Sequence, residues 1–281
     1  MAEWLQGVRP ALVSASFFIA CTLVPLAIPT TRRPIPGQEI TLVDGSTVFV
    51  RDPSVDRPNM PSTCPTAALG GILAVEAVVL LLVAILVPRR GWGGHHELWH
   101  VLSAGLLGSG LAHFLTECLK KYCGYLRPNF YAACQFDDTV KACVDEVLDL
   151  RHSFPSGHSS SSMVAGVLVC LYLLRIRHML AEASLRSSSC KASPFESSID
   201  LSNVVTVPPV SSATADARGA VQGGHTPVRS NTTHHTECAR HLLAVGALLP
   251  VILALWVAST RVHDNKHHPA DVVAGAVPVS Y

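Results

Sequence analysis

Long apolar runs separated by polar segments dominate the chain. Four of these runs are long enough to cross the hydrocarbon core of a bilayer, which takes about 20 helical residues. They cover about residues 10–29, 66–87, 159–176 and 242–259. A weaker candidate covers about 98–119 and carries three polar side chains, those of His100, His113 and Glu117. Polar residues inside a span are costly and usually face a functional interior. Together, the apolar runs predict an all-α fold, a polytopic bundle of membrane helices.

The first and last apolar runs need separate interpretation. Val272–Tyr281 would reach only about half way across a core of ~30 Å, so we expect five full transmembrane helices plus a truncated sixth. The N-terminal run lacks a preceding basic region and a clear small-residue cleavage site. We therefore interpret it as a membrane anchor rather than a signal peptide.

Composition agrees with a membrane protein. Charged residues make up 15% of the chain, hydrophobic residues 49%, and the mean hydropathy is +0.35. An average soluble domain has roughly 25% charged residues, so a water-soluble globule is not expected and disorder is excluded for most of the chain. The net charge of +1 gives no indication of a nucleic-acid partner.

Residues 182–237 have a different character from the rest. They are rich in serine, contain glycine and proline, and show no apolar periodicity, which is typical of disorder. We expect a single membrane domain over residues 1–281, with 182–237 as a disordered cytosolic loop inserted between the fourth and fifth spans. Asn231, in a glycosylation sequon, would then never be modified.

Basic residues near the ends of spans predict the orientation, because they favour the cytosolic side. These residues are Arg89 and Arg90 after the second span and Arg175 and Arg177 at the end of the fourth. The loops at 30–64, 120–157 and 260–270 then face the outside or a lumen.

The nine cysteines include no CxxC pair, so the sequence predicts no metal site. Cys134 and Cys143 share one polar loop, and both a disulfide and free thiols are compatible with the sequence. His234, Cys238 and His241 share one helical face, but we interpret them as a polar collar ahead of the fifth span.

Two polar constellations lie at one predicted membrane face. Lys120 and Arg127 are seven positions apart and could together hold a dianionic group, although basic residues at span ends often only reach the interface. Ser156 and Gly157 precede an apolar run, where the free amides of a helix N-terminus form an anion site. His158 beside them could donate a proton; the simpler interpretation is a helix cap with a solvated histidine.

A third constellation follows the fifth span and contains Arg261, His267, Pro269 and Asp271. Pro269 suits the first position of a helix, which makes Asp271 a first-turn acid able to reach back. A carboxylate bonded to one nitrogen of His267 would leave the other nitrogen as nucleophile or base. The alternative is a polar cap without chemistry.

The order and spacing of the three constellations resemble one family. The chain has lysine, six residues and Arg-Pro; then Pro-Ser-Gly-His; then arginine, five residues, histidine, three residues and aspartate. This pattern resembles the lipid phosphate phosphatases, or type 2 phosphatidate phosphatases, whose superfamily includes bacterial acid phosphatases and vanadium haloperoxidases. The resemblance covers about residues 10–277.

The resemblance implies an integral-membrane enzyme that hydrolyses phosphate monoesters of lipids such as phosphatidate, lysophosphatidate and sphingosine 1-phosphate, with no metal or other cofactor. His267 would form a phosphohistidine, Asp271 would orient it, and His158 would protonate the departing alkoxide. The phosphate would be bound by Lys120, Arg127, Ser156, Gly157 and Arg261. The expected partners are the lipid substrate, the bilayer and a homo-oligomeric copy, in the plasma membrane or endoplasmic reticulum with the site facing outside or into the lumen.

Two departures keep an alternative open. The family has serine where this chain has Thr260, which keeps the hydroxyl. The truncated sixth helix also permits a catalytically weak or inactive phosphatase-like signalling protein. The presence of Lys120, His158 and His267 argues against it. A sugar-phosphate phosphatase or lipid phosphotransferase of the same superfamily fits the Arg-Pro-Asn-Phe and Lys-His-His stretches less well.

Overall fold

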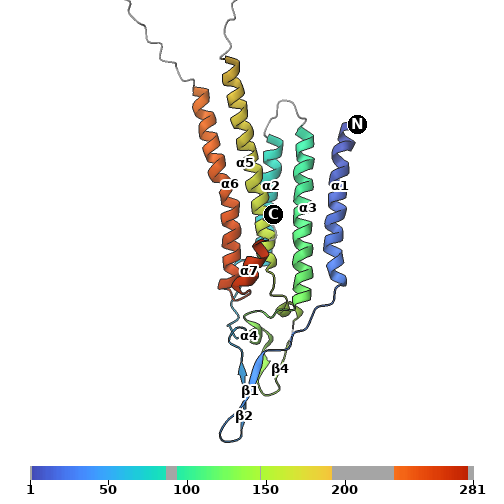
Figure 1. Cartoon of the computed structure of the whole chain (residues 1–281), viewed down its shortest axis with the longest axis vertical. Helices are drawn as coiled ribbons and strands as arrows, with labels where there is room; N and C mark the ends of the chain where they lie inside the picture. The colour runs from blue at the N-terminus through green and yellow to red at the C-terminus, as the bar shows by residue number, and fades with distance from the viewer. Residues whose placement is uncertain (1, 87–93, 146, 192–230, 278–281) are drawn as a thin grey trace, which may run out of the picture. The chain divides into compact units, whose positions relative to one another are not determined.

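The computed structural model describes residues 2–86, 94–145, 147–191 and 231–277. Five long helices dominate these residues (Figure 1): α1 (Ala2–Leu23), α2 (Thr66–Leu86), α3 (Gly94–Cys123), α5 (Gly157–Lys191) and α6 (Asn231–His263). Each contains a stretch long and apolar enough to cross a membrane: Val8–Ala27, Thr66–Ile85, Leu98–Cys123, Gly157–Glu182 and His241–His263. The all-α fold with five full spans is confirmed.

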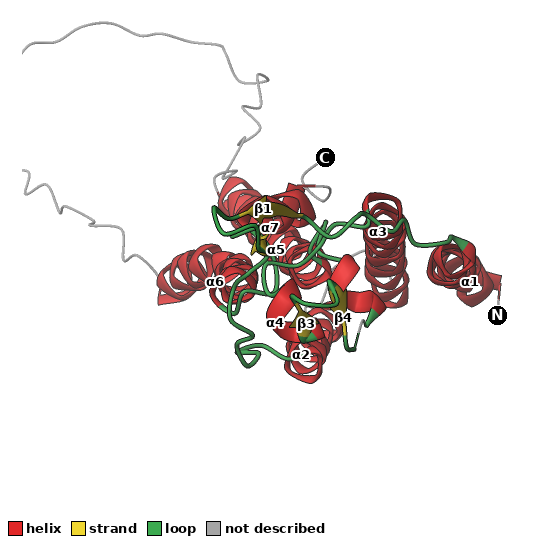
Figure 2. Ribbon diagram, turned by 90° about the horizontal axis from the view of Figure 1, so that it is seen from below, coloured by secondary structure: helices red, strands yellow, loops and turns green. Residues whose placement is uncertain are grey.

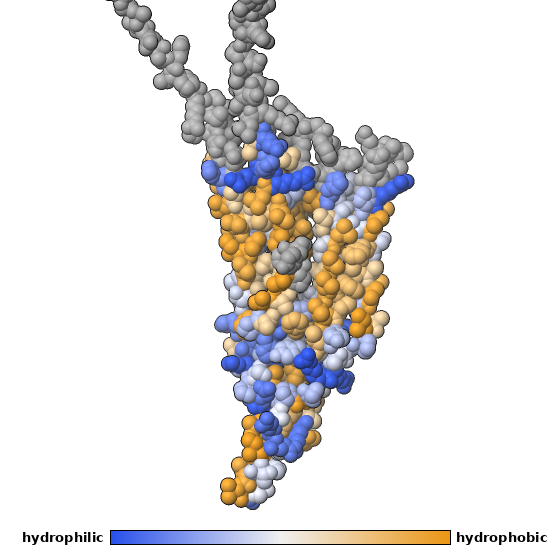
Figure 3. Space-filling view, viewed as in Figure 1, coloured by the Kyte–Doolittle hydropathy of each residue, from blue (hydrophilic) through white to orange (hydrophobic). Residues whose placement is uncertain are grey.

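The apolar side chains of these helices lie mostly on their outer surface. Only 11% to 28% of each candidate span is buried inside the protein, and Figure 3 shows hydrophobic residues gathered over the long helices. Bilayer lipid would cover such a surface, so close helix contacts depend on small residues. A Cβ on Gly110 of α3 would lie 3.1 Å from the Cα of Phe18 in α1, and one on Gly166 of α5 would lie 2.8 Å from the Pro250 carbonyl of α6.

Short elements follow the bundle on the side where α3 ends and α5 begins. They are η1 (Val24–Ala27), β1 (Gly37–Thr41), β2 (Thr47–Arg51), α4 (Phe130–Cys134), β3 (Phe136–Asp137), β4 (Ala142–Cys143) and η2 (Leu148–Arg151). β1 pairs antiparallel with β2 in the register Gly37 to Arg51, and β3 pairs antiparallel with β4. Cys134 and Cys143 form a disulfide, which decides between the two alternatives left open by the sequence.

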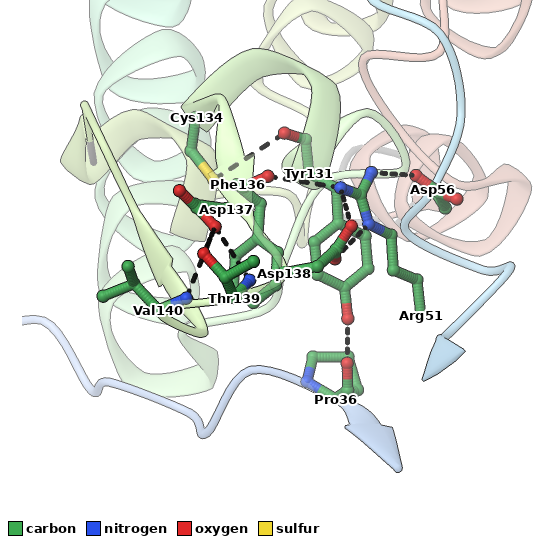
Figure 4. Close-up of polar contacts among 10 residues, drawn as sticks. All are labelled: Pro36, Arg51, Asp56, Tyr131, Cys134, Phe136, Asp137, Asp138, Thr139 and Val140. Carbon is green, nitrogen blue, oxygen red and sulfur yellow. Dashed lines mark hydrogen bonds and ion pairs between the residues drawn. The ribbon is translucent and has the colours of Figure 1, made fainter. Parts of the chain in front are cut away.

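Arg51 joins the two hairpins (Figure 4). Its Nε and Nη2 donate to the two carboxylate oxygens of Asp138, each at 2.8 Å, and its Nη1 lies 3.4 Å from Asp56. The guanidinium also covers the rings of Tyr131 and Phe136, at 5.3 and 5.7 Å from their centres. An arginine that binds a carboxylate through two hydrogen bonds and stacks on aromatic rings is held in one orientation. These contacts of Arg51 therefore hold α4 and the β3–β4 hairpin against β2.

The contacts divide the chain into two compact units, Met1–Arg175 with Ala244–Tyr281, and Ile176–Leu243. α5 continues to Lys191 and α6 begins at Asn231, so helices occupy both ends of the segment 182–237 that we expected to be disordered. Neither end contains the proline or glycine that would interrupt a helix. Residues 192–230, the remainder of that segment, lie outside the described residues, as do Arg89 and Arg90.

Candidate active site

The three constellations meet where α3 ends, α5 begins and α6 is followed by α7 (Pro269–Ala276). A Cβ on Gly157 would lie 3.1 Å from the Nζ of Lys120, so the first and second constellations are in contact. The backbone amide of Ser156 donates to the Asp271 carbonyl at 2.9 Å. In Figure 2, α7 is seen against the end of α5. The fold therefore brings together residues from positions 120 to 271.

His267 is buried and held by one strong hydrogen bond. Its Nδ1 lies 2.7 Å from the backbone carbonyl of Ser153, which can only accept, so Nδ1 carries the proton. In a neutral imidazole, Nε2 then holds the lone pair. Burial lowers the pKa of His267, and the positive charge of Arg127 lowers it further, whereas Asp271 and the Ser153 carbonyl act in the opposite direction. The ring is therefore neutral near pH 7, with a nucleophilic nitrogen.

Asp271 supports His267 through Ser153 rather than by a direct hydrogen bond. Its Oδ2 accepts from the Ser153 hydroxyl at 2.5 Å and from the His268 amide at 2.8 Å, but lies 3.8 Å from His267 Nδ1. Burial favours the protonated acid, yet the His267 ring and the Ser153 and His268 donors outweigh it and lower the pKa of Asp271. The expected hydrogen bond between the Asp271 carboxylate and the His267 imidazole is therefore not formed at this distance. Asp271 acts on His267 through its negative charge and through Ser153.

The position of Asp271 follows from local helix chemistry. His268 is the N-cap of α7, Pro269 is its first residue, and Asp271 closes a capping box onto the His268 amide. α7 also packs tightly on the start of α5, because a Cβ on Gly275 would lie 2.5 Å from the Ser156 carbonyl. Pro269 was correctly predicted as the start of a helix. The short helix α7 thus holds the third constellation against the second.

Arg261 is buried in an ion pair with Asp264. Its Nη2 donates to Asp264 Oδ2 at 2.6 Å and to the Ser62 hydroxyl at 2.9 Å. Asp264 also accepts from the amide and hydroxyl of Thr63, at 2.8 and 2.6 Å. Although burial opposes ionisation, these Thr63 bonds lower the pKa of Asp264. The carbonyl of Arg261 accepts from the His267 amide at 3.2 Å, so one turn positions both side chains.

Lys120 and Arg127 reach the site from the end of α3. The helix ends at Cys123, and Gly124 follows with a φ of 54°, so the two cations do not share one helical face. Lys120 pairs with Glu117 at 2.6 Å. Arg127 donates to the carbonyl and the carboxylate of Asp149 at 3.0 and 2.8 Å. Burial lowers the pKa of Arg127, and the nearby charge of Arg261 acts in the same direction.

The start of α5 supplies polar groups beside these cations. The Ser156 hydroxyl accepts from the Ser159 amide at 3.4 Å, as a helix cap does. The amides of a first helical turn have no partner within the helix, and Gly157 begins this turn. His158 Nε2 is buried and has no hydrogen-bond partner among the described residues. That nitrogen is therefore available to a bound group.

Lys266, next to His267, adds a cation that the sequence analysis did not single out. Its Nζ donates to Asn59 Oδ1 at 2.8 Å, and Asn129 donates to the same oxygen at 2.8 Å. Burial lowers the pKa of Lys266, and the charges of Arg127 and Arg261 lower it further. Within the described parts of the chain, no group of three or more His, Cys, Asp or Glu side chains could hold a metal ion.

Comparison with known families agrees with this geometry. The model of the PAP2 superfamily matches residues 105–278, more than half of the chain. The chain belongs to the PAP2 superfamily. The matched region begins within α3 and includes every residue of the three constellations. This result also confirms the family resemblance stated from the sequence.

Curated relatives of this PAP2 protein are phosphatases by name. Phospholipid phosphatase 1 of Rattus norvegicus is 30% identical over 149 residues, which cover 45% of this chain and 53% of the relative. Phospholipid phosphatase 2 of Bos taurus is 29% identical over 248 residues, which cover 81% and 67%. A putative phosphatidate phosphatase of Drosophila melanogaster is 25% identical over 203 residues, which cover 64% and 38%. The chain thus spans about half the length of the first of these relatives. No solved structure matches.

Sequence reasoning missed three residues at this candidate site: Ser153, which contacts His267 and Asp271, Asp264, which pairs with Arg261, and Lys266, which is next to His267. Ser153 directly precedes the Phe154–His158 stretch, and only the fold shows that both its carbonyl and hydroxyl serve the third constellation. Asp264 lies three residues after Arg261, a spacing that pairs opposite charges on a helix. That spacing was a usable signal.

Proposed function

We propose that this PAP2 protein is an integral-membrane lipid phosphate phosphatase that works through a phosphohistidine without a metal. The observation that carries the proposal is His267: a buried, neutral imidazole whose Nδ1 is held by the Ser153 carbonyl. Positive side chains converge on the same place. Phosphoryl transfer depends mainly on positioning and on compensation of charge, and this arrangement offers both.

In the proposed ground state, a phosphate dianion lies among the positive side chains and the start of α5. Lys120, Arg127 and Arg261 neutralise its charge, while the Ser156 hydroxyl and the Gly157 amide donate hydrogen bonds. Each of these cations already has an acidic partner that holds it in place. Arg127 can exchange its partner for a phosphate oxygen, because the Asp149 side chain is 63% exposed.

In the first chemical step, His267 Nε2 attacks phosphorus. The P–N bond forms as the bond from phosphorus to the lipid oxygen breaks, and His158 gives its proton to the departing alkoxide. In the second step, a water molecule gives a proton to His158 and attacks phosphorus. The P–N bond breaks, phosphate leaves and neutral His267 is regenerated. Asp271 stabilises the positive charge that His267 acquires in each step.

Lipid phosphates fit the position of the site. The site lies at the ends of α3, α5 and α6, each of which contains a candidate membrane span, so a phosphate headgroup could enter while its chains stay in the bilayer. Substrates of the phosphatidate, lysophosphatidate and sphingosine 1-phosphate class are proposed on this ground. The Cys134–Cys143 disulfide supports an oxidising side of the plasma membrane or endoplasmic reticulum.

Phosphate release from a short-chain phosphatidate by the purified chain, in magnesium-free buffer with chelator, tests the proposal. We expect turnover that added Mg²⁺ does not increase. A complete absence of turnover with each of the three lipid classes would instead favour the inactive signalling protein. Turnover that depends on a divalent cation would contradict the metal-free mechanism.

A further inference from the structure

A second candidate site lies inside the membrane-spanning part of the bundle. A cavity of about 490 Å³ is lined by residues of α1, α2, α3 and α5. This volume is within the range of about 300–1,000 Å³ that is typical of small-molecule sites. Its walls are mainly leucine, valine and alanine, but five polar side chains also face it: Thr22, Glu76, Ser109, His113 and Ser161. None of the proposed catalytic or phosphate-binding residues lines it.

The side chain of Glu76 indicates that this cavity binds a ligand. It is the one charged residue of α2, it is only 7% exposed, and its Oε2 has no hydrogen-bond partner among the described residues. A buried carboxyl group without a partner is costly, and an ionisable side chain inside a membrane usually marks a functional site. The described residues that line the cavity include no lysine or arginine. No described residue of the cavity therefore offers a permanent positive charge to Glu76, and a cationic ligand would supply one.

We propose that this cavity binds a single-chain lipid amine. A primary ammonium would pair with the Glu76 carboxylate and has two further N–H donors, which suit the Ser109 and Ser161 hydroxyls and His113. The hydrocarbon chain would lie along the apolar walls formed by residues such as Leu80 and Leu168. A neutral lipid chain would fill the volume but would leave the Glu76 charge without compensation, so the observations favour the amine.

The cavity and the proposed active site are close but separate. Ser161, at the near end of the cavity, follows Gly157 by one helical turn, which is about 6 Å along α5. Binding at Glu76 would thus take place within the hydrocarbon region, and it requires no phosphatase activity. The inference does not rest on the proposed function and can fail or succeed independently of it.

The test measures the thermal unfolding midpoint of the full chain in nanodiscs of uncharged lipid with increasing dodecylamine. Dodecanol, with the same chain and no positive charge, is the matched probe. At a saturating concentration of about 100 times Kd, we expect dodecylamine to raise the midpoint by about 5 °C or more. Dodecanol should have a clearly smaller effect. Glu76→Gln, which keeps the side-chain shape, should remove the difference between the two probes.

Two glycine variants test the location of the site. A side chain at Gly105, which lines the cavity, would meet no atom within 4 Å of its Cβ, and the same is true at Gly71 of α2, which does not line it. Gly105→Leu should therefore abolish the dodecylamine shift while Gly71→Leu keeps it. Equal shifts with both probes in the wild type would show a hydrocarbon site and overturn the proposal. An undiminished dodecylamine shift in Glu76→Gln or in Gly105→Leu would overturn it as well.

Discussion

Two regions of the candidate site hold their charged groups in different ways. One is the turn at residues 261–267, which carries His267, and the other is the segment at residues 120–127, which carries Lys120 and Arg127. In the turn, Arg261 and Asp264 form an ion pair in which both side chains are at most 4% exposed, and His267 is bonded to a buried carbonyl. In the segment, Arg127 pairs with Asp149, which is largely exposed. His267, the proposed nucleophile, and Arg261 are thus rigidly placed, whereas Arg127 keeps an exposed partner that a phosphate can replace.

The largest expected effect comes from breaking the rigid turn at its nucleophile. His267→Ala should lower kcat by about 10⁴-fold or more, because the covalent route is lost. His268→Ala is the matched control: it should keep most of the activity, since His268 caps α7, its ring packs 5.1 Å from the Tyr125 ring and its Nε2 lies 3.2 Å from the Leu126 carbonyl. Initial rates of phosphate release measure both. Equal residual activity in the two variants would show that the nucleophile is misassigned.

The same comparison predicts different stability losses for two aspartates. Asp264→Asn leaves Arg261 buried without a counter-charge, so we expect a loss of about 3–5 kcal/mol. Asp149→Asn breaks a pair with an exposed acid and should cost at most about 1 kcal/mol, with a change mainly in KM. Unfolding in detergent and steady-state kinetics measure these effects. Similar stability losses in both variants would remove the distinction between the two regions.

Burial of His267 also predicts how stability depends on pH. The pKa of His267 is lowered in the folded chain, so below about pH 6.5 the unfolded chain binds a proton that the folded chain does not. This residue therefore makes stability fall as the pH falls below that value. The loss between about pH 7 and pH 5.5 should be smaller in His267→Gln than in the wild type or in His268→Gln. Identical pH dependence in all three would contradict a buried neutral ring.

The smallest expected effect is none at all, at Asn231. This residue lies at the start of α6, in a sequon and between the fourth and fifth spans. The basic residues near the span ends predict that this region lies in the cytosol, so glycosidase treatment should not change the mass of the chain from eukaryotic cells. A mass shift that Asn231→Gln removes would invert the orientation and move both compared regions to the cytosolic face.

The membrane spans could be predicted because the hydropathy of a stretch depends only on the residues within that stretch. The candidate histidine and its cations could be proposed from the sequence because their order and spacing lie within short stretches. The residues that hold them could not. Ser153 lies 114 positions from His267, and Thr63 lies 201 positions from Asp264, so their contacts exist only after folding. The same holds for Glu76, whose cavity is formed by four helices.

The central claim is that His267 is transiently phosphorylated, and rapid quenching with a lipid substrate labelled in its phosphate tests it directly. The account predicts acid-labile, alkali-stable label on the wild-type chain, located by peptide mass at residue 267. The label should be present in His268→Ala and absent in His267→Ala. Label on another residue, or full turnover by His267→Ala without any labelled chain, would contradict it.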